Sequence, residues 1–342
     1  MTTENALRRR GQAVRLLLLA GLFAVIAAVT LAIQSRSISG EAGAGPVIPG
    51  LAEIIGDGQR ITIASAEASY GIERSRLGED AVWVMSDRGD YPVLAARLRQ
   101  LTEGLESLTY VRRMTSDPSK HERLGVGDPR EGGRGVLVQI EDGRGAYLVN
   151  LILGVEPGGL YVRRPDDNQT WSVRGELPPL RDVASWLDLR PLGIDPDVLA
   201  RVEITPSEGR GYVLARDNAE SPWRIAAPAV PPLAQSTLVS TAEMLTQLSP
   251  VDVQPAPAIQ GAPAARVRAL TFDEMAIEAE LIESDGRLWI KAVVLALTPE
   301  QEEAALALND RAAPWAYGLR DLEARALAPP LRDLLPGSGE IQ

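Results

Sequence analysis

The sequence predicts an α+β protein: an N-terminal transmembrane helix followed by two tandem repeats, each a mostly antiparallel sheet with one or two packed helices. Three observations predict it. They are an uncharged apolar run near the N-terminus, a set of landmarks that recurs about 140 residues later, and short alternating segments around leucine-spaced helices. The 342 residues suffice for two such repeats, because a domain typically takes ~100 to 200 residues.

Residues 16–34 are the predicted transmembrane helix. Leu16 to Ile33 holds no charge and covers ~27 Å at ~1.5 Å per residue, close to the hydrocarbon core of a bilayer. A cleaved signal peptide is the alternative, but its apolar region usually has only ~7 to 15 residues and ends at a small-x-small site, which the segment from Thr30 to Gln34 fits poorly. The absence of cysteine excludes a lipoprotein anchor.

The flanking residues predict the orientation. Residues 1–15 form a basic tail, with four arginines against the single acid Glu4, so the positive-inside rule places the N-terminus in the cytoplasm. The protein is therefore expected to cross the inner membrane of a bacterium once, with most of the chain in the periplasm. Residues 35–52, rich in Gly, Ala and Pro, are the expected tether between membrane and folded part.

Paired landmarks predict that residues 53–192 and 193–336 are two copies of one α+β unit, followed by a tail at 337–342. The offsets between partners stay within 140 to 144 residues, which favours a tandem duplication. The pairs are Arg60–Ile63 with Arg201–Ile204, Tyr70 with Tyr212, Trp83 with Trp223, Asp142–Arg144 with Asp285–Arg287, Tyr147 with Trp289, and Trp171 with Trp315.

The same order of elements is expected in both units: three short strands, an amphipathic helix, three longer strands around Asp-Gly turns, and a short closing helix. In the first unit the strands are expected at 61–65, 70–74, 82–85, 136–140, 147–153 and 161–163, and the helices at 94–108 and 180–189. In the second unit the strands are expected at 202–205, 212–215, 223–226, 267–272, 277–282 and 288–295, and the helices at 238–248 and 321–335.

The composition excludes several kinds of chemistry. With no cysteine and one histidine, the chain cannot build a thiolate nucleophile, a disulfide, an iron–sulfur site or a multi-histidine metal site. The formal net charge of -11 would repel a polyanion, so we expect no nucleic acid partner. No cofactor-binding, metal-binding or catalytic residue is assigned from the sequence.

Several landmarks resemble those of the bacterial domain-of-unknown-function family 4340 (DUF 4340). They are Trp171-Ser172-Val173, Trp186 to Arg190, Ile194-Asp195, Val202-Glu203-Ile204, Trp83, Leu124-Gly125-Val126 with Pro129, and Tyr161-Val162-Arg163. Leu189 departs from the family pattern, in which arginine or aspartate is commoner, and so does the lack of a tyrosine before Gly125. The resemblance implies a single-pass envelope protein facing the periplasm, often encoded beside ABC-2-type exporter components and gliding-motility-type auxiliary subunits. It implies no enzymatic activity and supplies no catalytic residues.

The residues that invite a catalytic reading each have a structural explanation. The only histidine, His121, lies in a polar segment that is expected to be an exposed loop or helix start, without a G-x-S-x-G elbow. Asp166-Asp167 is expected in a loop before the strand at Trp171, and the acids from Glu300 to Glu303 are expected at a helix N-terminus. The glycine-rich stretches 132–135 and 143–145 are expected to be turns between strands, and the paired tryptophans repeated core positions.

The function expected from the sequence is therefore that of a non-enzymatic, membrane-anchored periplasmic protein, an accessory or interaction subunit of an ABC-type exporter or another envelope complex. Its partners would be the membrane and a protein such as ABC transporter subunits, docked at the surface between the two repeats. Two alternatives remain open: a tethered envelope-glycan hydrolase that uses paired carboxylates, and a module that binds a small ligand or lipid in an apolar pocket between the repeats.

Overall fold

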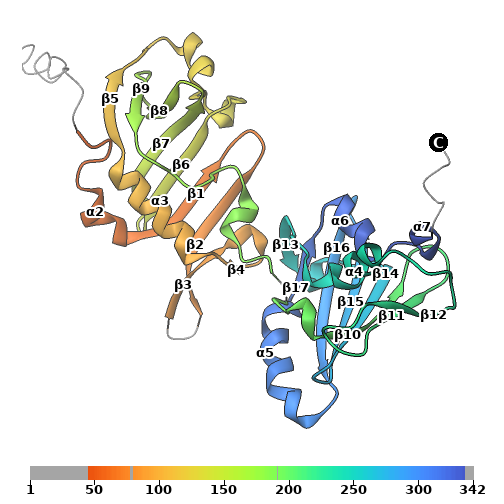
Figure 1. Ribbon diagram of the computed structural model, residues 1–342. Helices are drawn as coiled ribbons and strands as arrows, with labels where there is room; N and C mark the ends of the chain where they lie inside the picture. Colours follow the sequence, from red (N-terminus) through yellow and green to blue (C-terminus); the bar gives the residue numbers. More distant parts are fainter. Residues whose placement is uncertain (1–44, 78–79, 191, 336–342) are drawn as a thin grey trace, which may run out of the picture.

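The computed structural model describes residues 45–77, 80–190 and 192–335 (Figure 1). The predicted basic tail 1–15, transmembrane helix 16–34, most of the tether 35–52 and the tail 337–342 lie outside the described residues. Among the described helices, none combines the length and the apolar character needed to cross a membrane.

Two antiparallel sheets dominate the α+β fold, as Figure 1 shows, and the sequence predicted this arrangement. The first sheet has nine strands: β1 Gly58–Ala64, β2 Ser69–Leu77, β3 Asp80–Met85, β4 Tyr91–Pro92, β5 Thr109–Arg113, β6 Val136–Asp142, β7 Tyr147–Glu156, β8 Gly159–Arg163 and β9 Trp171–Arg174. The second has eight: β10 Leu199–Thr205, β11 Tyr212–Ala215, β12 Arg224–Ala227, β13 Asp252–Pro255, β14 Pro263–Thr271, β15 Met275–Ser284, β16 Arg287–Ala296 and β17 Trp315–Gly318.

The strand orders of the two sheets correspond. The first sheet runs β4-β3-β2-β1-β6-β7-β8-β9-β5 and the second runs β12-β11-β10-β14-β15-β16-β17-β13. If the two-residue edge strand β4 is left out, the two orders match strand for strand. In each sheet the last strand of the order, β5 or β13, comes earlier in the chain than the strand it pairs with, β9 or β17. Two buried tyrosines mark the match, because the hydroxyl of Tyr70 donates to Leu180 O at 2.8 Å and that of Tyr212 donates to Pro329 O at 2.9 Å.

One helix with an apolar face packs into the core of each half (Figure 1). Helix α3 (Ala95–Ser107) buries Leu101 and Leu105, and α4 (Gln235–Glu243) buries Leu238 and Ala242, at the spacing that the sequence predicted. The other helices are α2 Leu51–Ile54, α5 Glu302–Ala312, α6 Asp321–Leu327 and α7 Leu331–Leu334. Short 3₁₀ turns are η1 Ile55–Asp57, η2 Ser86–Arg88, η3 Pro118–Lys120, η4 Glu122–Leu124, η5 Pro129–Glu131, η6 Val183–Trp186, η7 Pro196–Val198, η8 Met244–Thr246, η9 Ala256–Ala258 and η10 Pro299–Gln301.

The two predicted closing helices are wrong in extent. Residues 180–189 contain only the 3₁₀ turn η6, because the chain after it extends to pair with the first sheet: Leu94 N donates to Trp186 O and Leu187 bridges Val93. The helix expected at 321–335 is divided into α6 and α7 by Pro329-Pro330, since proline lacks the backbone N–H that a continuing helix requires.

One landmark pairing is also wrong. The Asp142-Gly143 turn joins β6 to β7, whereas Asp285-Gly286 joins β15 to β16, which correspond to β7 and β8. Tyr147 and Trp289 are therefore not equivalent, and their exposed fractions of 52% and 7% agree with that. A long connection before β6 and the insertion of α5 before β17 offset each other, which kept the spacing near 142 residues and disguised the shift.

Residues 45–52, assigned to the tether by sequence, belong to the fold of the first half. Val47 and Leu51 are buried in its core, and Pro46 bridges Thr109 at the start of the edge strand β5. Burial of these two apolar side chains stabilises the folded state, which explains why the segment joins the core.

The halves meet where η2 and β4 of the first contact β13 and β17 of the second. Tyr91 packs edge-on against Trp315, with 4.8 Å between ring centroids. Asp252 accepts from Arg88 at 2.6 Å and from Arg287 at 2.8 Å, and so joins an arginine of each half. The contact is close, because the Cβ of any residue replacing Gly89 would clash with the ring of Pro255.

Candidate functional site

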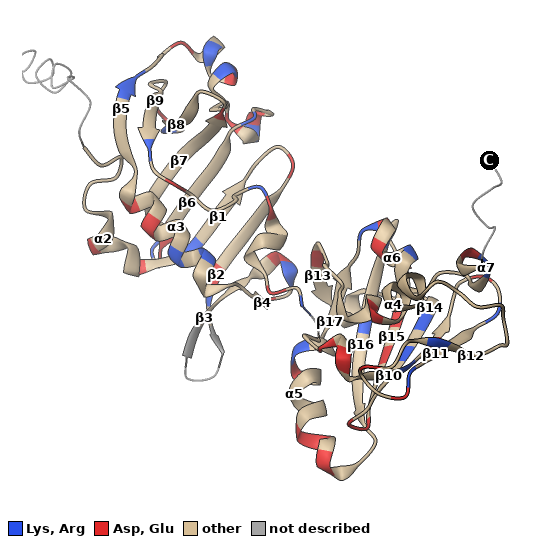
Figure 2. Ribbon diagram, viewed as in Figure 1, with Lys and Arg blue, Asp and Glu red and all other residues tan. Residues whose placement is uncertain are grey.

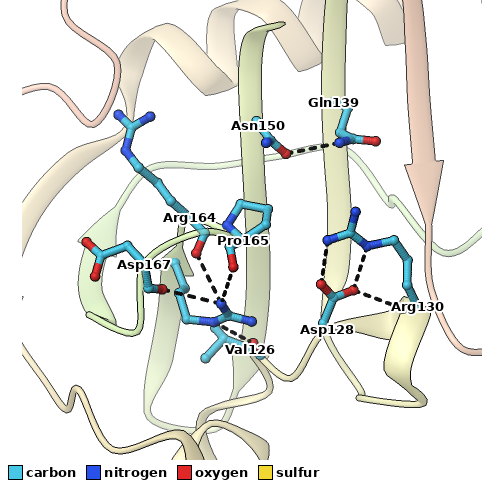
Figure 3. A network of polar contacts seen from close by, with 9 residues as sticks. Val126, Asp128, Arg130, Gln139, Asn150, Arg164, Pro165 and Asp167 are labelled. Carbon is cyan, nitrogen blue, oxygen red and sulfur yellow. Dashed lines mark hydrogen bonds and ion pairs between the residues drawn. The ribbon is translucent and has the colours of Figure 1, made fainter.

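Each sheet has one face in the shared core and one outer face, and the outer faces differ. In the first sheet the outer row Ala64–Leu137–Ile152–Arg163 lies under the connection at residues 114–135, where Val126 and Leu124 pack on it. The next row contains Gln139 and Asn150, whose side chains bond to each other at 3.1 Å (Figure 3). The chain itself therefore covers these two rows, whereas Arg60 and Glu73 in the row beyond them form an exposed ion pair.

Arg163 holds residues 114–135 against the first sheet. It is 6% exposed and donates to the carbonyl oxygens of Val126, Arg164, Pro165 and Asp167 at 3.1 to 3.3 Å (Figure 3). Burial lowers the pKa of the guanidinium below its usual value, and nearby carboxylates, Asp128 first among them, act in the opposite direction. The guanidinium thus acts as a structural clamp, because it donates its hydrogen bonds to backbone carbonyls of both segments, 114–135 and 164–167.

The outer face of the second sheet is open and charged over two rows, beyond a buried row of Ile282 and Trp289 on which Ile259 packs. Its corresponding row is Thr205–Arg266–Glu280–Lys291, and the next row is Glu203–Arg268–Glu278–Val293. Acidic and basic residues alternate across β14, β15 and β16, as the colours in Figure 2 show. Arg266 contacts Glu280 at 3.1 Å and Arg268 contacts Glu278 at 3.5 Å.

We call these two rows, together with Ala313, the second-sheet face. A groove of about 460 Å³ runs over it. Val293 and the neighbouring Leu295 are 40% and 42% exposed, so the charged rows adjoin apolar side chains. The ion pairs are half-exposed and contribute little to folding, on the order of 0 to 1 kcal/mol each. A partner could compete for these charges at low cost.

The sequence could have revealed this face. Arg-Val-Arg at 266–268 and Glu-Ala-Glu at 278–280 alternate charge with a small or apolar residue, the pattern of a strand with one solvated face. Their pairing depends on the turn at 272–274, where Glu274 takes a positive φ of 66°. That turn sets the register, and the sequence pattern alone does not specify it.

The single histidine is not exposed as the sequence suggested. His121 is 6% exposed and sits between η3 and η4, where its Nε2 lies 2.9 Å from Asn168 O. The carbonyl accepts only from a protonated nitrogen, so this contact fixes Nε2 as the donor. The histidine therefore ties the 114–135 connection to the loop before β9.

The other candidates lie where the sequence placed them. Asp166-Asp167 is in the loop before β9, and Glu302 and Glu303 form the first turn of α5. Trp83 and Trp223 pack on the core at matching places, as do Trp171 and Trp315. Within residues 45–77, 80–190 and 192–335, no cluster of three or more His, Cys, Asp or Glu side chains could hold a metal ion.

Three further grooves lie on the first half. Like the groove over the second-sheet face, each is lined by residues of one half only. One of about 620 Å³ is largely apolar, between the strand ends at Val136 and Leu153 and the segment 175–182. Another of about 510 Å³ separates α3 from the same segment. The third, of about 500 Å³, is basic and lies at the end of β5. At the junction between the halves, where the sequence suggested a partner, Tyr91 contacts Trp315 and Asp252 contacts two arginines.

The fold defines a class: an α+β protein of two antiparallel sheets with corresponding strand orders. A family model, the domain of unknown function DUF4340, matches residues 83–254, from β3 to β13. The match covers half of the chain, and the protein belongs to this family. The comparison with curated proteins and the comparison with solved structures found no match.

Proposed function

We propose that this protein is a non-enzymatic, membrane-tethered periplasmic subunit of an envelope complex, of which an ABC-type exporter is the leading candidate, and that its partner docks on the second-sheet face. The observation that carries the proposal is the contrast between the two outer faces. Two rows of the first sheet are covered by the chain itself, under residues 114–135, and within the described residues the corresponding two rows of the second sheet are open to solvent.

The correspondence of the sheets gives this contrast its meaning. We take the two halves, with boundaries near 53–192 and 193–336, to be copies of one ancestral unit, which the matching strand orders and the paired tyrosine hydroxyl bonds support. A face that one copy covers with its own chain is suited to cover by another chain in the second copy. Charged rows beside exposed Val293 and Leu295 have the mixture of apolar and charged surface that protein interfaces use.

The membrane tether rests on the apolar run Leu16 to Ile33 and its basic flank. The exporter association rests on the resemblance to members encoded beside exporter components. A hydrolase gains no support from the second-sheet face, because Glu278 and Glu280 each contact an arginine rather than facing each other across a cleft.

One observation favours a second candidate. The groove of about 620 Å³ beside Leu153 and Leu177 is lined mostly by apolar side chains, and Val155 on its rim is 78% exposed. Such a groove suits an apolar small molecule or an acyl chain. It lies within the first half rather than between the halves.

Photo-crosslinking tests the docking face. A photoreactive amino acid replaces Val293 in the full-length protein in its native membrane, and a matched one replaces Leu322 of α6, which is 81% exposed. The proposal expects an adduct with an exporter permease or ATPase from position 293 and not from position 322. Equal yields from both positions, or reproducible adducts from neither, would refute it.

A further inference from the structure

We infer that the basic groove at the end of β5 binds the headgroups of anionic phospholipids in the membrane that holds the protein's own N-terminal segment, an inference that rests on the proposed membrane tether. The groove is lined by Met114, Thr115 and Leu124 and by four cations, Arg112, Arg113, Lys120 and Arg123. Each of the four cations is exposed.

The charge of the groove contrasts with the rest of the chain. Residues 109–124 hold these four cations and two acids, Asp117 and Glu122, a net of +2, in a chain with a net of -11. Asp117 forms an ion pair with Lys120 at 3.2 Å, and Glu122 forms one with the guanidinium of Arg134 at 3.5 Å. Within the described residues, Arg112 and Arg123 have no carboxylate partner, so both are available to an anion.

A β-bulge directs Arg112 outward. The pairing of β5 with β9 shifts between Tyr110, opposite Val173, and Arg112, opposite Ser172. Regular alternation would put Arg112 on the same side as Tyr110, which packs on the core. The extra residue, Val111, moves Arg112 to the outer side. Arg113, opposite Trp171, lies on the side of Tyr110, and its Nε donates to Gln169 at 2.6 Å at the end of the strand.

The tether ends beside this groove. Val47 N donates to Leu108 O and Tyr110 N donates to Gly45 O, so residues 45 to 47 run antiparallel to residues 108 to 110. Going toward its N-terminus, the described chain therefore points along β5 toward Arg112 and Arg113. Residues 35–44 separate Gly45 from the predicted span, and ten residues reach at most ~35 Å.

These facts together favour a lipid surface as the occupant. Cations attract the negative surface of a membrane over about a Debye length, ~8 Å at physiological ionic strength, and the short tether lets the groove come within that distance. Phosphate groups suit the arginines, because a guanidinium can bind two oxygens at once. Held in this way, the first half would lie on the membrane with β5 facing the lipid.

The test uses the full chain in two kinds of vesicle, one of pure phosphatidylcholine and one in which a third of the lipid is phosphatidylglycerol. Because the chain has no cysteine, Ser116→Cys gives a single site for a donor dye beside the groove, with an acceptor dye on a trace lipid headgroup. Ser240→Cys, on an exposed face of α4, serves as the distant label.

We expect energy transfer from position 116 to rise about twofold in the anionic vesicles and to fall again with added salt, with no such change at position 240. The variant Arg112→Glu/Arg123→Glu should lose the rise. Its control, Arg210→Glu/Arg320→Glu, changes the net charge equally on the second half and should keep it. Matching circular dichroism spectra would establish that all variants fold.

Equal transfer in both vesicles for a chain that floats with them would overturn the inference and leave the tether intact. A chain that does not float with neutral vesicles would overturn the tether itself, and the inference with it. Loss of the rise in both charge variants would show that net charge acts rather than the groove, and would also overturn the inference.

Discussion

Arg163 of β8 and Lys291 of β16 occupy equivalent positions in the two sheets. Each donates a hydrogen bond to a backbone carbonyl in the connection that leads into β6 or β14, which lies two strands away in the same sheet. Arg163 donates to Val126 O and Lys291 to Ile259 O. The first connection, 114–135, is long enough to fold over its sheet, whereas the second, 256–262, packs only on the end row of Ile282 and Trp289. The difference in length between these two connections accounts for the covered and the open face.

The clamp predicts unequal effects of two substitutions. Arg163→Met leaves four carbonyls without their donor in a buried place and should lower the free energy of unfolding by about 2 to 4 kcal/mol. Lys291→Met removes one bond at a partly exposed site and should cost about 1 kcal/mol or less. Denaturant titration of both variants measures the difference, and equal losses would contradict the clamp.

The junction predicts a steric effect at Gly89. Its φ is 67°, and an added Cβ would meet the ring of Pro255 in the other half. Gly209 has a φ of 90° with open space around it, so Gly209→Ala isolates the cost of the backbone conformation, about 1 kcal/mol. We expect Gly89→Ala to cost at least ~1 kcal/mol more in thermal or denaturant unfolding. If the two variants unfold alike, the halves are not in close contact there.

Asp252 predicts a second effect at the junction. Its side chain is 15% exposed and binds an arginine from each half, so Asp252→Asn should destabilise the protein by about 1 to 3 kcal/mol. The exposed pair of Glu208 and Arg332 gives the matched control, and Glu208→Gln should change stability by less than about 0.5 kcal/mol. If the junction contributes nothing to stability, a denaturant titration should show an equally small loss in the free energy of unfolding for both variants.

The buried tyrosines predict a loss of stability in alkali. Burial raises the pKa of Tyr70, and nearby Asp182 adds to that shift; burial likewise raises the pKa of Tyr212. The unfolded chain ionises these phenols above pH ~10, while the folded chain resists. Their contribution is therefore complete below pH 10 and is lost as the pH rises toward their folded values. Unfolding midpoints at pH 8 and pH 11 should differ less in Tyr70→Phe than in the wild type.

Much of the fold follows from local pattern. The alternation at Ile61 and Ile63 predicted β1, and the leucine spacing from Leu94 to Leu108 predicted α3. The edge strands β4, β5 and β13 were missed, because they are two to five residues long and exist through pairing with distant strands rather than through their own sequence. Local periodicity contains no information about such partners.

The candidate site was harder to predict than the elements. The sequence placed the partner between the repeats, on the general tendency of paired modules to form a groove. The actual difference between the faces depends on which connection covers which sheet and on the register that sets Arg266 opposite Glu280. Both are tertiary properties, so the spacing of charges at 266–268 and 278–280 is compatible with a solvated face but contains no information on how the chain covers its counterpart in the first half.

Purification of the tagged protein from its native membrane after mild crosslinking tests the central claim most directly, with the variant Arg266→Glu/Arg268→Glu as the comparison. These exposed arginines contribute little to stability, so the variant should fold as the wild type does. We expect mass spectrometry to recover an exporter permease and its ATPase with the wild type, above a control containing residues 1–44 alone, and to recover at least about tenfold less with the variant. Recovery of no reproducible partner, or of the same partners in equal amounts with both proteins, would contradict docking at the second-sheet face.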